Sequence, residues 1–420
     1  MIKSFLKIVF RNLWRYKDYT LINIIGMGIG IAAMIWGYQT YKYSFSYDNF
    51  HKDRDHVYRV LTYKKDAEGM KGIVPLPAIA QAQNDFSGIK EAVAWDSRGL
   101  SVKYDKSDAF AENAHFTQPA FFNLFNFPLV AGSNDINNRN AVLITEKTAK
   151  KYFGQQDAIG KTLIFYAGET YAMPLTVTGV LKDIPFNSTL RFEFITHFDN
   201  YLKNDGIKID ADDWKWFVDA AFFSIPDAAN AERVEKEMNK YILVQNSARE
   251  DWKVTAFKFI SLRKHASLSN MITSNNFYER PGDAAAFGPL VLAFLIFLSA
   301  CLNFSNTTVA RAGRRLKEIG MRKVMGSTHG QLIRQLLLEC SIIVFAAILL
   351  SIVLNNWWLP AFNKMFGDIN VQANYLSDAG LVIFLAFILL GATLLAGFYP
   401  AFYISRFNPT AIFRGSVKFG

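Results

Sequence analysis

Four long stretches of the sequence contain no Asp, Glu, Lys or Arg, and they indicate the plan of the chain. They cover residues 19–41, 284–310, 340–363 and 379–405 of the 420 residues. About 20 helical residues cross a hydrocarbon core of about 30 Å, where a charge costs several kcal/mol. We therefore predict transmembrane helices at 19–41, 286–308, 336–359 and 380–404, rather than four buried helices of a soluble protein.

The segment between the first two stretches alternates between strand and helix patterns. The runs with strand character are 57–63, 175–181, 217–225 and 254–260. The runs with helical character are 75–86, 145–153 and 228–244. This alternation predicts one mixed α+β domain over residues 42–285, with an Asn- and Asp-rich surface loop at 132–140. A second, short outer loop is expected at 360–379.

The net charge of +10 is concentrated beside the predicted membrane helices. Residues 1–18, the loop between the second and third helices, and the C-terminal tail carry +4, +5 and +3, whereas the outer domain and the outer loop each carry −1. Short loops rich in Lys and Arg stay in the cytoplasm. We therefore predict that residues 1–18, 309–335 and 405–420 are cytoplasmic, with both termini inside and the large domain outside.

The basic residues are not arranged for binding nucleic acid, because they flank membrane helices instead of forming a stripe with interleaved aromatic residues. Near the N-terminus, Lys3, Lys7, Arg11 and Arg15 recur every four positions against apolar residues at helical spacing. This pattern predicts a cytoplasmic amphipathic helix over 1–18 that lies on anionic membrane lipids. A frayed basic leader is the alternative.

Glycines recur in the first apolar stretch, at Gly26, Gly28 and Gly30. No strand precedes them, so a nucleotide-binding turn is not expected. The spacing of Gly26 and Gly30 instead favours close helix packing, with an incidental glycine content as an equal alternative. The stretch is longer than the apolar part of a cleavable signal peptide, which predicts a permanent anchor.

Residues 154–162 imitate a phosphate-binding loop, since Gly154, Gly160, Lys161 and Thr162 follow in order. Five residues instead of four separate the glycines, and a helix instead of a strand precedes them, so we interpret Gly154 as a helix end. The six histidines lack paired ligand spacing, and both cysteines lie in or beside predicted membrane helices. We therefore expect no catalytic residue, no cofactor and no metal site in this chain.

The loop between the second and third membrane helices carries an amphipathic pattern. One helical face holds Arg311, Arg314, Arg315, Glu318 and Arg322. Gly326 would end this helix before the third membrane segment. A short helix of this kind can dock in a groove of a soluble partner, and the alternative is a basic loop that only fixes the orientation.

Short motifs follow one another along nearly the whole chain. They are RNLWRYK (11–17), INIIGMGIG (22–30), SYDNF (46–50), VLITEKTAKKYFG (142–154), VTGVLKDIP (177–185), RLKEIGMRKVMG (315–326) and GFYPAFYISRFNP (397–409). In this order they resemble the permease subunits of MacB/FtsX-type ABC transporters, also called type VII. The resemblance accounts for the imitated phosphate-binding loop as well, because it matches a segment of the outer domain in that family.

The resemblance implies a permease of the bacterial cytoplasmic (inner) membrane with a two-lobed, MacB-type outer domain. ATP would be bound and hydrolysed by a separate ABC ATPase, so this chain is not expected to be an enzyme. The residues implied to couple to that ATPase are Arg314, Arg315, Glu318, Gly320, Met321, Arg322, Lys323 and Gly326. Motion of this coupling helix would pass through the first and second membrane helices to the outer domain, which exports or extracts a substrate.

The assembly and the substrate stay open from the sequence. The usual assembly pairs two permease units, as a homodimer or a heterodimer, and the resemblance allows an extracytoplasmic adaptor as a further partner. Some relatives are duplicated, so the chain is either a half-length subunit or half of a longer permease. An FtsX-like regulator of an extracytoplasmic partner, such as a cell-wall hydrolase, is the alternative function. A membrane-anchored enzyme is a third interpretation, which no catalytic constellation supports.

Overall fold

The computed structural model describes residues 11, 14–105, 108–168, 171–204, 207–310, 320–321, 323–367 and 369–405. The chain divides into two compact units. The helical unit holds Met1–Phe45 and Asp283–Gly420, and the α/β unit holds Ser46–Gly282. Most of the amphipathic helix predicted over 1–18 lies outside the described residues.

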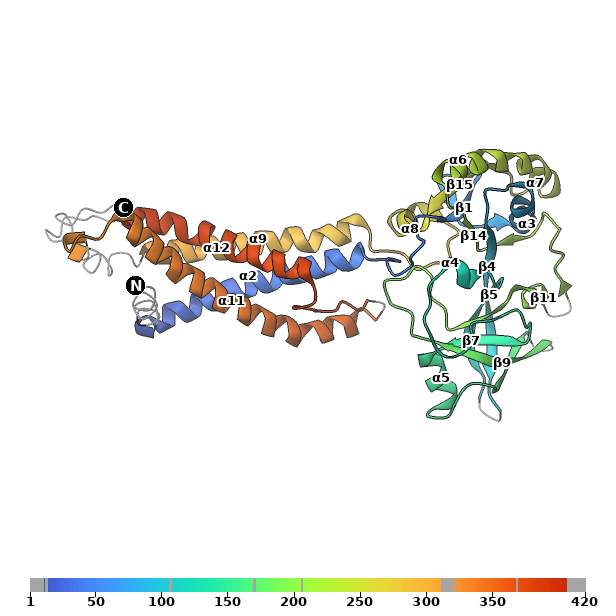
Figure 1. Ribbon diagram of the computed structural model, residues 1–420, viewed down its shortest axis with the longest axis horizontal. Helices are drawn as coiled ribbons and strands as arrows, with labels where there is room; N and C mark the ends of the chain where they lie inside the picture. The colour runs from blue at the N-terminus through green and yellow to red at the C-terminus, as the bar shows by residue number, and fades with distance from the viewer. Residues whose placement is uncertain are drawn as a thin grey trace. The chain divides into compact units, whose positions relative to one another are not determined.

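Four long helices form the described part of the helical unit (Figure 1). They are α2 (Lys17–Ser44), α9 (Asp283–Ala310), α11 (His329–Met365) and α12 (Ala379–Ser405). Each is long and apolar enough to cross a membrane, which confirms the predicted fold of four transmembrane helices. Which residues of each helix lie in the membrane stays a prediction.

The helix α11 begins before the membrane segment predicted at 336–359, because its first turn is capped. Thr328 Oγ1 accepts from Gln331 N at 3.3 Å, and Gln331 Oε1 accepts from Thr328 N at 3.1 Å. This reciprocal pair satisfies backbone N–H groups that a helix start otherwise leaves without a partner. The helix therefore includes Arg334 and Glu339 in its first turns.

The helix α2 is the most buried of the four and packs against α9 and α11, while α12 packs against α11 and α9. Its side chains Met27, Ile31 and Ile35 lie in the apolar core of this unit. Asn355 of α11 donates its Nδ2 to Ala32 O of α2 at 3.0 Å. The two helices are thus joined by a partly buried hydrogen bond as well as by apolar contacts.

Most described strands of the α/β unit belong to one 12-stranded sheet (Figure 1). The order is β16-β2-β1-β14-β4-β5-β10-β7-β9-β6, with β15 paired to β1 and β8 paired to β4 and β9. The strands are β1 (Val57–Lys64), β2 (Met70–Lys71), β3 (Val74–Pro75), β4 (Glu91–Lys103), β5 (Phe110–Thr117), β6 (Leu129–Gly132), β7 (Ala141–Thr145), β8 (Thr162–Ala167), β9 (Tyr171–Leu181), β10 (Phe194–His197), β11 (Lys203–Asn204), β12 (Ile207–Lys208), β13 (Phe217–Val218), β14 (Ala220–Ser224), β15 (Val254–Ser261) and β16 (Ile272–Thr273). The α-helices are α3 (Leu76–Asp85), α4 (Phe121–Leu124), α5 (Glu146–Phe153), α6 (Ala228–Glu237), α7 (Ile242–Ala248) and α8 (Leu262–Leu268).

The 13-residue strand β4 carries different partners along its length. Trp95 in its first half lies opposite Ala220 of β14, and Ser101 in its second half lies opposite Tyr166 of β8. The Trp95 ring centroid is 5.1 Å from that of Phe121, within a buried aromatic cluster. A large mixed α/β domain is thus confirmed, while its division into two lobes stays a prediction.

Most of the predicted elements of this region are present, as β1, β9, β15, α3 and α5. The helix predicted over 228–244 is wrong as a single element, because the 3-10 turn Met238–Tyr241 separates α6 from α7. In this turn Tyr241 donates its hydroxyl to Asp85 Oδ2 at 2.8 Å. This contact joins the interrupted region to the end of α3.

The strand predicted over 217–225 is also wrong as a single element. It breaks at Asp219, so β13 pairs with β3 while β14 remains in the large sheet. Asp219 N donates to Asp96 Oδ2 at 3.2 Å, and Ser97 Oγ donates to Asp219 Oδ2 at 2.8 Å. These hydrogen bonds occupy Asp219 in place of regular strand pairing.

Candidate functional site

The segment predicted to couple to an ATPase lies between α9 and α11, and the structure describes part of it. Arg314, Arg315, Glu318 and Arg322 lie outside the described residues. Gly320 is buried, and Gly326 has a φ of 94°, a backbone conformation that favours glycine. Gly326 N donates to Lys323 O at 3.0 Å, so the helical turn ends here, as the sequence predicted.

Lys323 is attached to the helical bundle. Its Nζ donates to Ser405 O at the end of α12, at 2.5 Å. Burial lowers the pKa of Lys323 below its ordinary value. This contact ties the segment to α12, which the sequence did not suggest, because the two residues are 82 positions apart.

Apolar side chains of the same segment are exposed. Met321 is 52% exposed, Val324 70% and Met325 79%. Apolar side chains that are exposed close together in the sequence are candidates for a contact surface. Met325 was not among the predicted coupling residues, although its place next to the helix-ending Gly326 was visible in the sequence.

The predicted packing glycines Gly26 and Gly30 have different surroundings. A methyl group at Gly30 would lie 3.2 Å from Phe297 Cα of α9, whereas one at Gly26 would meet nothing within 4 Å. Gly37 is tighter still, because a methyl group there would lie 2.8 Å from Leu290 Cα. Close approach of α2 and α9 therefore requires Gly30 and Gly37, and Gly26 faces away from the described helices.

An acidic residue, Glu339, is buried among the helices of the helical unit. Gln335 Nε2 donates to its Oε1 at 3.5 Å. Tyr19, Thr308 and Gly397 help Glu339 to line a cavity of about 30 Å³, about the volume of one water molecule. Sequence reasoning missed this site, although Glu339 directly precedes the third charge-free stretch.

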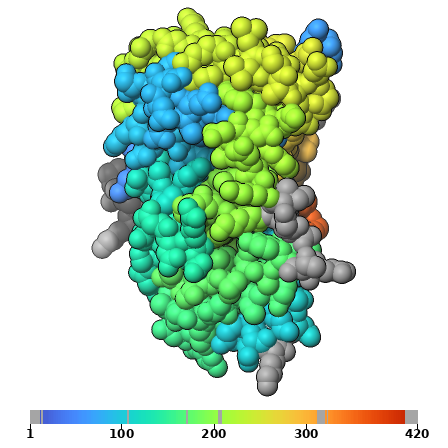
Figure 2. Space-filling view, turned by 90° about the vertical axis from the view of Figure 1, so that its right-hand side faces the viewer, coloured from blue at the N-terminus to red at the C-terminus, as the bar shows by residue number. Residues whose placement is uncertain are grey.

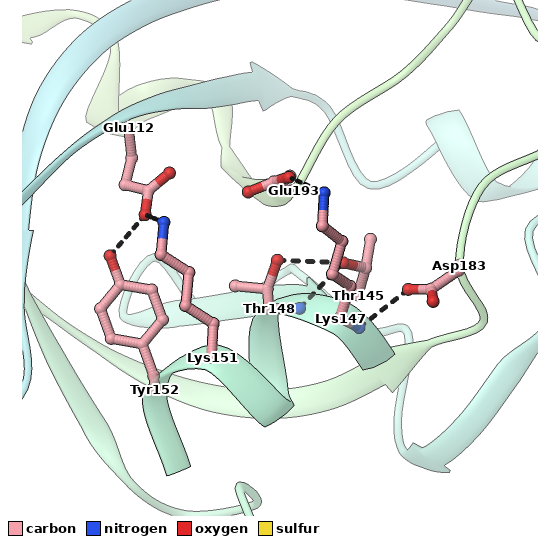
Figure 3. Close-up of polar contacts among 8 residues, drawn as sticks. All are labelled: Glu112, Thr145, Lys147, Thr148, Lys151, Tyr152, Asp183 and Glu193. Carbon is pink, nitrogen blue, oxygen red and sulfur yellow. Dashed lines mark hydrogen bonds and ion pairs between the residues drawn. The ribbon is translucent and has the colours of Figure 1, made fainter. Parts of the chain in front are cut away.

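The motif VLITEKTAKKYFG spans strand β7 and helix α5, and its polar residues fix the helix to neighbouring segments (Figure 3). Thr145 Oγ1 accepts from Thr148 N at 3.3 Å, and Lys147 N donates to Asp183 Oδ1 at 2.8 Å. At the other end, Glu112 Oε1 accepts from Lys151 Nζ at 2.5 Å. These contacts cap and anchor the helix, so the motif has a structural role here.

Residues 154–162 resemble a phosphate-binding loop in sequence but do not have the geometry of such a loop. Gly154 ends α5 with a φ of 63°, as predicted, and Thr162 begins the strand β8. A phosphate loop joins a strand to a helix start, where backbone N–H groups converge on the phosphates. Here a helix end leads into a strand, and Lys161 Nζ is occupied by Gln156 Oε1.

A groove of about 810 Å³ opens on the α/β unit. Its aromatic lining is Tyr201, Trp216 and Phe217, and its charged lining is Asp213, Lys215, Arg249, Glu250 and Asp251. In Figure 2 the lime-green segment that contains Trp216 lies beside the yellow helices α6 and α7. The volume lies within the usual range of ligand sites. Its lining comes from three separate segments, which no local sequence pattern reveals.

Two carboxylates lie close together beside Tyr201. Asp96 is buried, and its Oδ1 accepts from Ser97 N at 2.7 Å. Burial, together with the nearby charge of Asp219, raises the pKa of Asp96 to about 8. Burial and the nearby carboxylate of Asp96 also raise the pKa of the Tyr201 hydroxyl. Asp96 therefore keeps its proton to a higher pH than an ordinary aspartate does.

Metal-binding groups are not assembled in the part of the chain that the structure describes. No three His, Cys, Asp or Glu side chains there lie close enough to hold an ion. Cys301 and Cys340 are buried thiols within the helical unit.

Comparison with known proteins relates both units to permease families. Residues 20–241 match the MacB-like periplasmic core domain, and residues 290–409 match the FtsX-like permease C-terminal domain. The macrolide export ATP-binding/permease protein MacB of Pasteurella multocida (strain Pm70) is 21% identical over 301 residues, which are 69% of this chain and 41% of that protein. MacB of Neisseria meningitidis serogroup A is 20% identical over 330 residues, 77% of this chain and 46% of that protein. The chain thus spans less than half the length of these curated relatives.

Two solved structures are similar to part of the chain. The extracellular domain of the ABC-type transporter YknZ from Gram-positive bacteria has a TM-score of 0.36 and 17% identity, covering 47% of this chain and 99% of that one. The periplasmic region of MacB from Actinobacillus actinomycetemcomitans has a TM-score of 0.35 and 15% identity, covering 49% of this chain and 89% of that one.

Proposed function

Because the chain belongs to the MacB/FtsX-type family of ABC transporter permeases, we propose that it couples ATP hydrolysis by an ABC ATPase to movement of its α/β unit. One observation carries the proposal: a MacB-like core domain and an FtsX-like permease domain follow each other in a chain with four candidate membrane helices. The movement would export or extract a substrate on the outer side of the membrane, without a substrate path through the helices.

The ATPase is proposed to be a separate subunit that carries the ATP. The matched relatives are named ATP-binding/permease proteins, whereas this chain matches a MacB-like periplasmic core domain and an FtsX-like permease C-terminal domain. The docking site would be the segment 314–326. Its exposed apolar residues Met321, Val324 and Met325 support this, because a protein partner would remove them from water.

The location and assembly follow the same proposal. The chain is a membrane protein, and we place it in the bacterial inner membrane with both termini in the cytoplasm, because the basic segments flank the helices on that side. It would pair with a second permease unit, with a homodimer as the first choice and a heterodimer next. An extracytoplasmic adaptor and anionic lipids are further expected partners.

The groove beside Trp216 is the part of the α/β unit that we propose to contact the substrate. It offers three aromatic rings and several charged groups within a ligand-sized volume. An FtsX-like regulatory function is not favoured, since the matched curated relatives are named as export proteins.

The docking proposal is tested by co-purification of the full chain with the ABC ATPases of its host. The double variant Val324→Asp, Met325→Asp should lower ATPase recovery at least about tenfold, because it places charges in an apolar contact. Leu376→Asp is the matched control, since Leu376 is 96% exposed in the loop between α11 and α12. Equal recovery with the double variant and the wild type would contradict the docking surface, and recovery of no ATPase with the wild type would contradict the function.

A further inference from the structure

The chain enters the α/β unit directly after α2, and this incoming segment is held by the loop between β9 and β10. Thr189 N donates to Asp48 Oδ1 at 2.9 Å, and Thr189 Oγ1 donates to Asp48 Oδ2 at 2.7 Å. Asp48 N donates to Asn187 O at 3.0 Å, and Asn187 Nδ2 donates to Ser46 Oγ at 2.9 Å. Asp48 itself is fully buried, with a φ of 57°. The loop therefore fixes both the backbone and the carboxylate of the incoming segment.

The same loop also holds the outgoing segment, which leads directly to α9. Tyr278 N donates to Thr189 O at 3.1 Å. The Arg191 guanidinium lies 4.1 Å from the centroid of the Tyr278 ring. One residue, Thr189, thus bonds the incoming segment through its N–H and hydroxyl and the outgoing segment through its carbonyl.

A second path joins the two segments through the interior. Arg59 Nη1 donates to Asn275 Oδ1 of the outgoing segment at 2.8 Å and lies 2.6 Å from His265 Nε2. His265 Nδ1 lies 3.3 Å from Thr189 Oγ1. Because the Thr189 hydroxyl donates to Asp48 and Arg59 can only donate, the network assigns the proton of a neutral His265 to Nδ1. A directed chain of hydrogen bonds then runs from Arg59 to Asp48.

The ends of this chain are opposite charges that do not touch. Arg59 and Asp48 are both fully buried, and His265 and Thr189 lie between them. Burying charges is costly unless hydrogen bonds compensate, and an apolar cluster would fill the same space without that cost. What the polar chain adds is direction, since each hydrogen bond fixes the angle as well as the distance between its groups.

We propose that residues 187–191, with Asp48, Arg59 and His265, form a clasp that makes the incoming and outgoing segments move as one body with the sheet. This deepens the proposed function and rests on it, because displacement of α2 or α9 would then reach the whole α/β unit instead of being absorbed by loose connections. Thr189 is the central positioning residue of the clasp. It acts through the two segments and is not among the residues that line the groove.

The clasp is tested by hydrogen exchange of the full chain in lipid nanodiscs, without any ATPase. Thr189→Val keeps the shape of the side chain and removes its hydroxyl, which bonds a buried carboxylate. Amide exchange should become at least about tenfold faster in both the incoming peptide 46–51 and the outgoing peptide 274–282, as expected for losing a charged hydrogen bond. Faster exchange in only one of the two peptides would overturn the clasp.

Thr196→Val is the matched control, because Thr196 is also buried in this unit and its Oγ1 donates to Ala141 O at 2.6 Å. Thr196→Val should leave the amide exchange of both peptides unchanged. If both variants speed exchange equally, Thr189 contributes only to the general stability of the domain, and the clasp is contradicted. Asp48→Asn is an independent test, because the substitution lies on the incoming segment. If the clasp links the two segments, this variant also makes amide exchange in the outgoing peptide faster. An outgoing segment that does not respond overturns the clasp, whereas failure to recruit an ATPase bears only on the proposed function.

Discussion

The two units keep their interiors in place by different means. In the helical unit, α2 and α9 approach closely because Gly30 and Gly37 have no side chains, and a long hydrogen bond of 3.4 Å from Thr307 Oγ1 to Asn23 Oδ1 accompanies that packing. In the α/β unit, buried charges such as Asp48 and Arg59 are held by chains of hydrogen bonds. Helices in lipid gain little from the hydrophobic effect and depend on close packing, whereas a water-exposed domain satisfies most of the polar groups that it buries with hydrogen bonds.

This difference bears on a protein that is proposed to pass on movement. Van der Waals contacts between packed helices depend on distance but little on direction, so they oppose sliding less than hydrogen bonds do. Directed hydrogen bonds resist such sliding, so the α/β unit is better suited to moving as a whole. The variants below test whether packing governs one unit and polar networks the other.

The largest effect is expected from Gly37→Ala in the helical unit. The new methyl group would lie 2.8 Å from Leu290 Cα, a backbone atom that cannot turn away, so α2 and α9 must separate. Overpacking of this kind costs about 1–3 kcal/mol. Gly26→Ala adds the same group where nothing lies within 4 Å and should be neutral or slightly stabilising. Thermal midpoints of the full chain in one detergent compare the two, and equal midpoints would contradict packing control.

A pH-dependent effect, at most about 1.4 kcal/mol for each pH unit, is expected from Asp96→Asn in the α/β unit. Burial, with the charge of Asp219, raises the pKa of Asp96 to about 8, so the folded protein keeps a proton that the unfolded chain loses above about pH 4. The stability of the wild type should therefore fall as pH rises between these values, by up to about 1.4 kcal/mol per pH unit from this group. Asparagine has no proton to lose and should flatten that slope.

The measurement for Asp96→Asn is the unfolding midpoint of variant and wild type between pH 5 and pH 8.5, at about equal salt. The variant should gain stability relative to the wild type as pH rises. His115 titrates in the opposite sense, because burial lowers its pKa to about 4, but it is present in both proteins. Its contribution cancels in the difference. Parallel pH profiles would show that Asp96 is ionised in the folded protein.

The sequence allowed the helical unit to be predicted better than the α/β unit, for a physical reason. A membrane helix must be apolar along its whole length, so each charge-free stretch reveals it locally. The break at Asp219 depends on Asp96, which lies 123 positions away, and the clasp joins Asp48 to Thr189 across 141 positions. Such contacts leave no periodic pattern. The predicted coupling residues also form a local sequence pattern. The exposure of Met325 and the hydrogen bond from Lys323 to Ser405 O, in contrast, can be recognised only in the folded structure.

The smallest effect is expected from removing one ion pair in each unit. Glu112 Oε1 accepts from Lys151 Nζ at 2.5 Å and from the Tyr152 hydroxyl at 2.7 Å, so Glu112→Gln removes the charge but keeps an acceptor for Tyr152. In the helical unit, Lys42 Nζ lies 2.5 Å from Asp378 Oδ2, and Asp378→Asn removes that charge. The Lys151 and Lys42 side chains are 39% and 52% exposed, whereas the Glu112 and Asp378 side chains are 8% and 15% exposed, so solvent reaches each pair from its lysine end. Each variant should lose less than about 1 kcal/mol.

Salt decides whether these two losses have the same origin. Raising the salt from about 0.05 M to about 0.5 M shortens the screening length severalfold and should remove most of either loss. If both variants approach the wild-type midpoint at high salt, exposed ion pairs contribute equally little to the two units. The difference between the two units would then come from helix packing at Gly37 in one unit and from directed hydrogen bonds in the buried network of the other. A loss in Glu112→Gln that salt does not reduce would instead place this carboxylate among the buried polar groups that hold the α/β unit rigid.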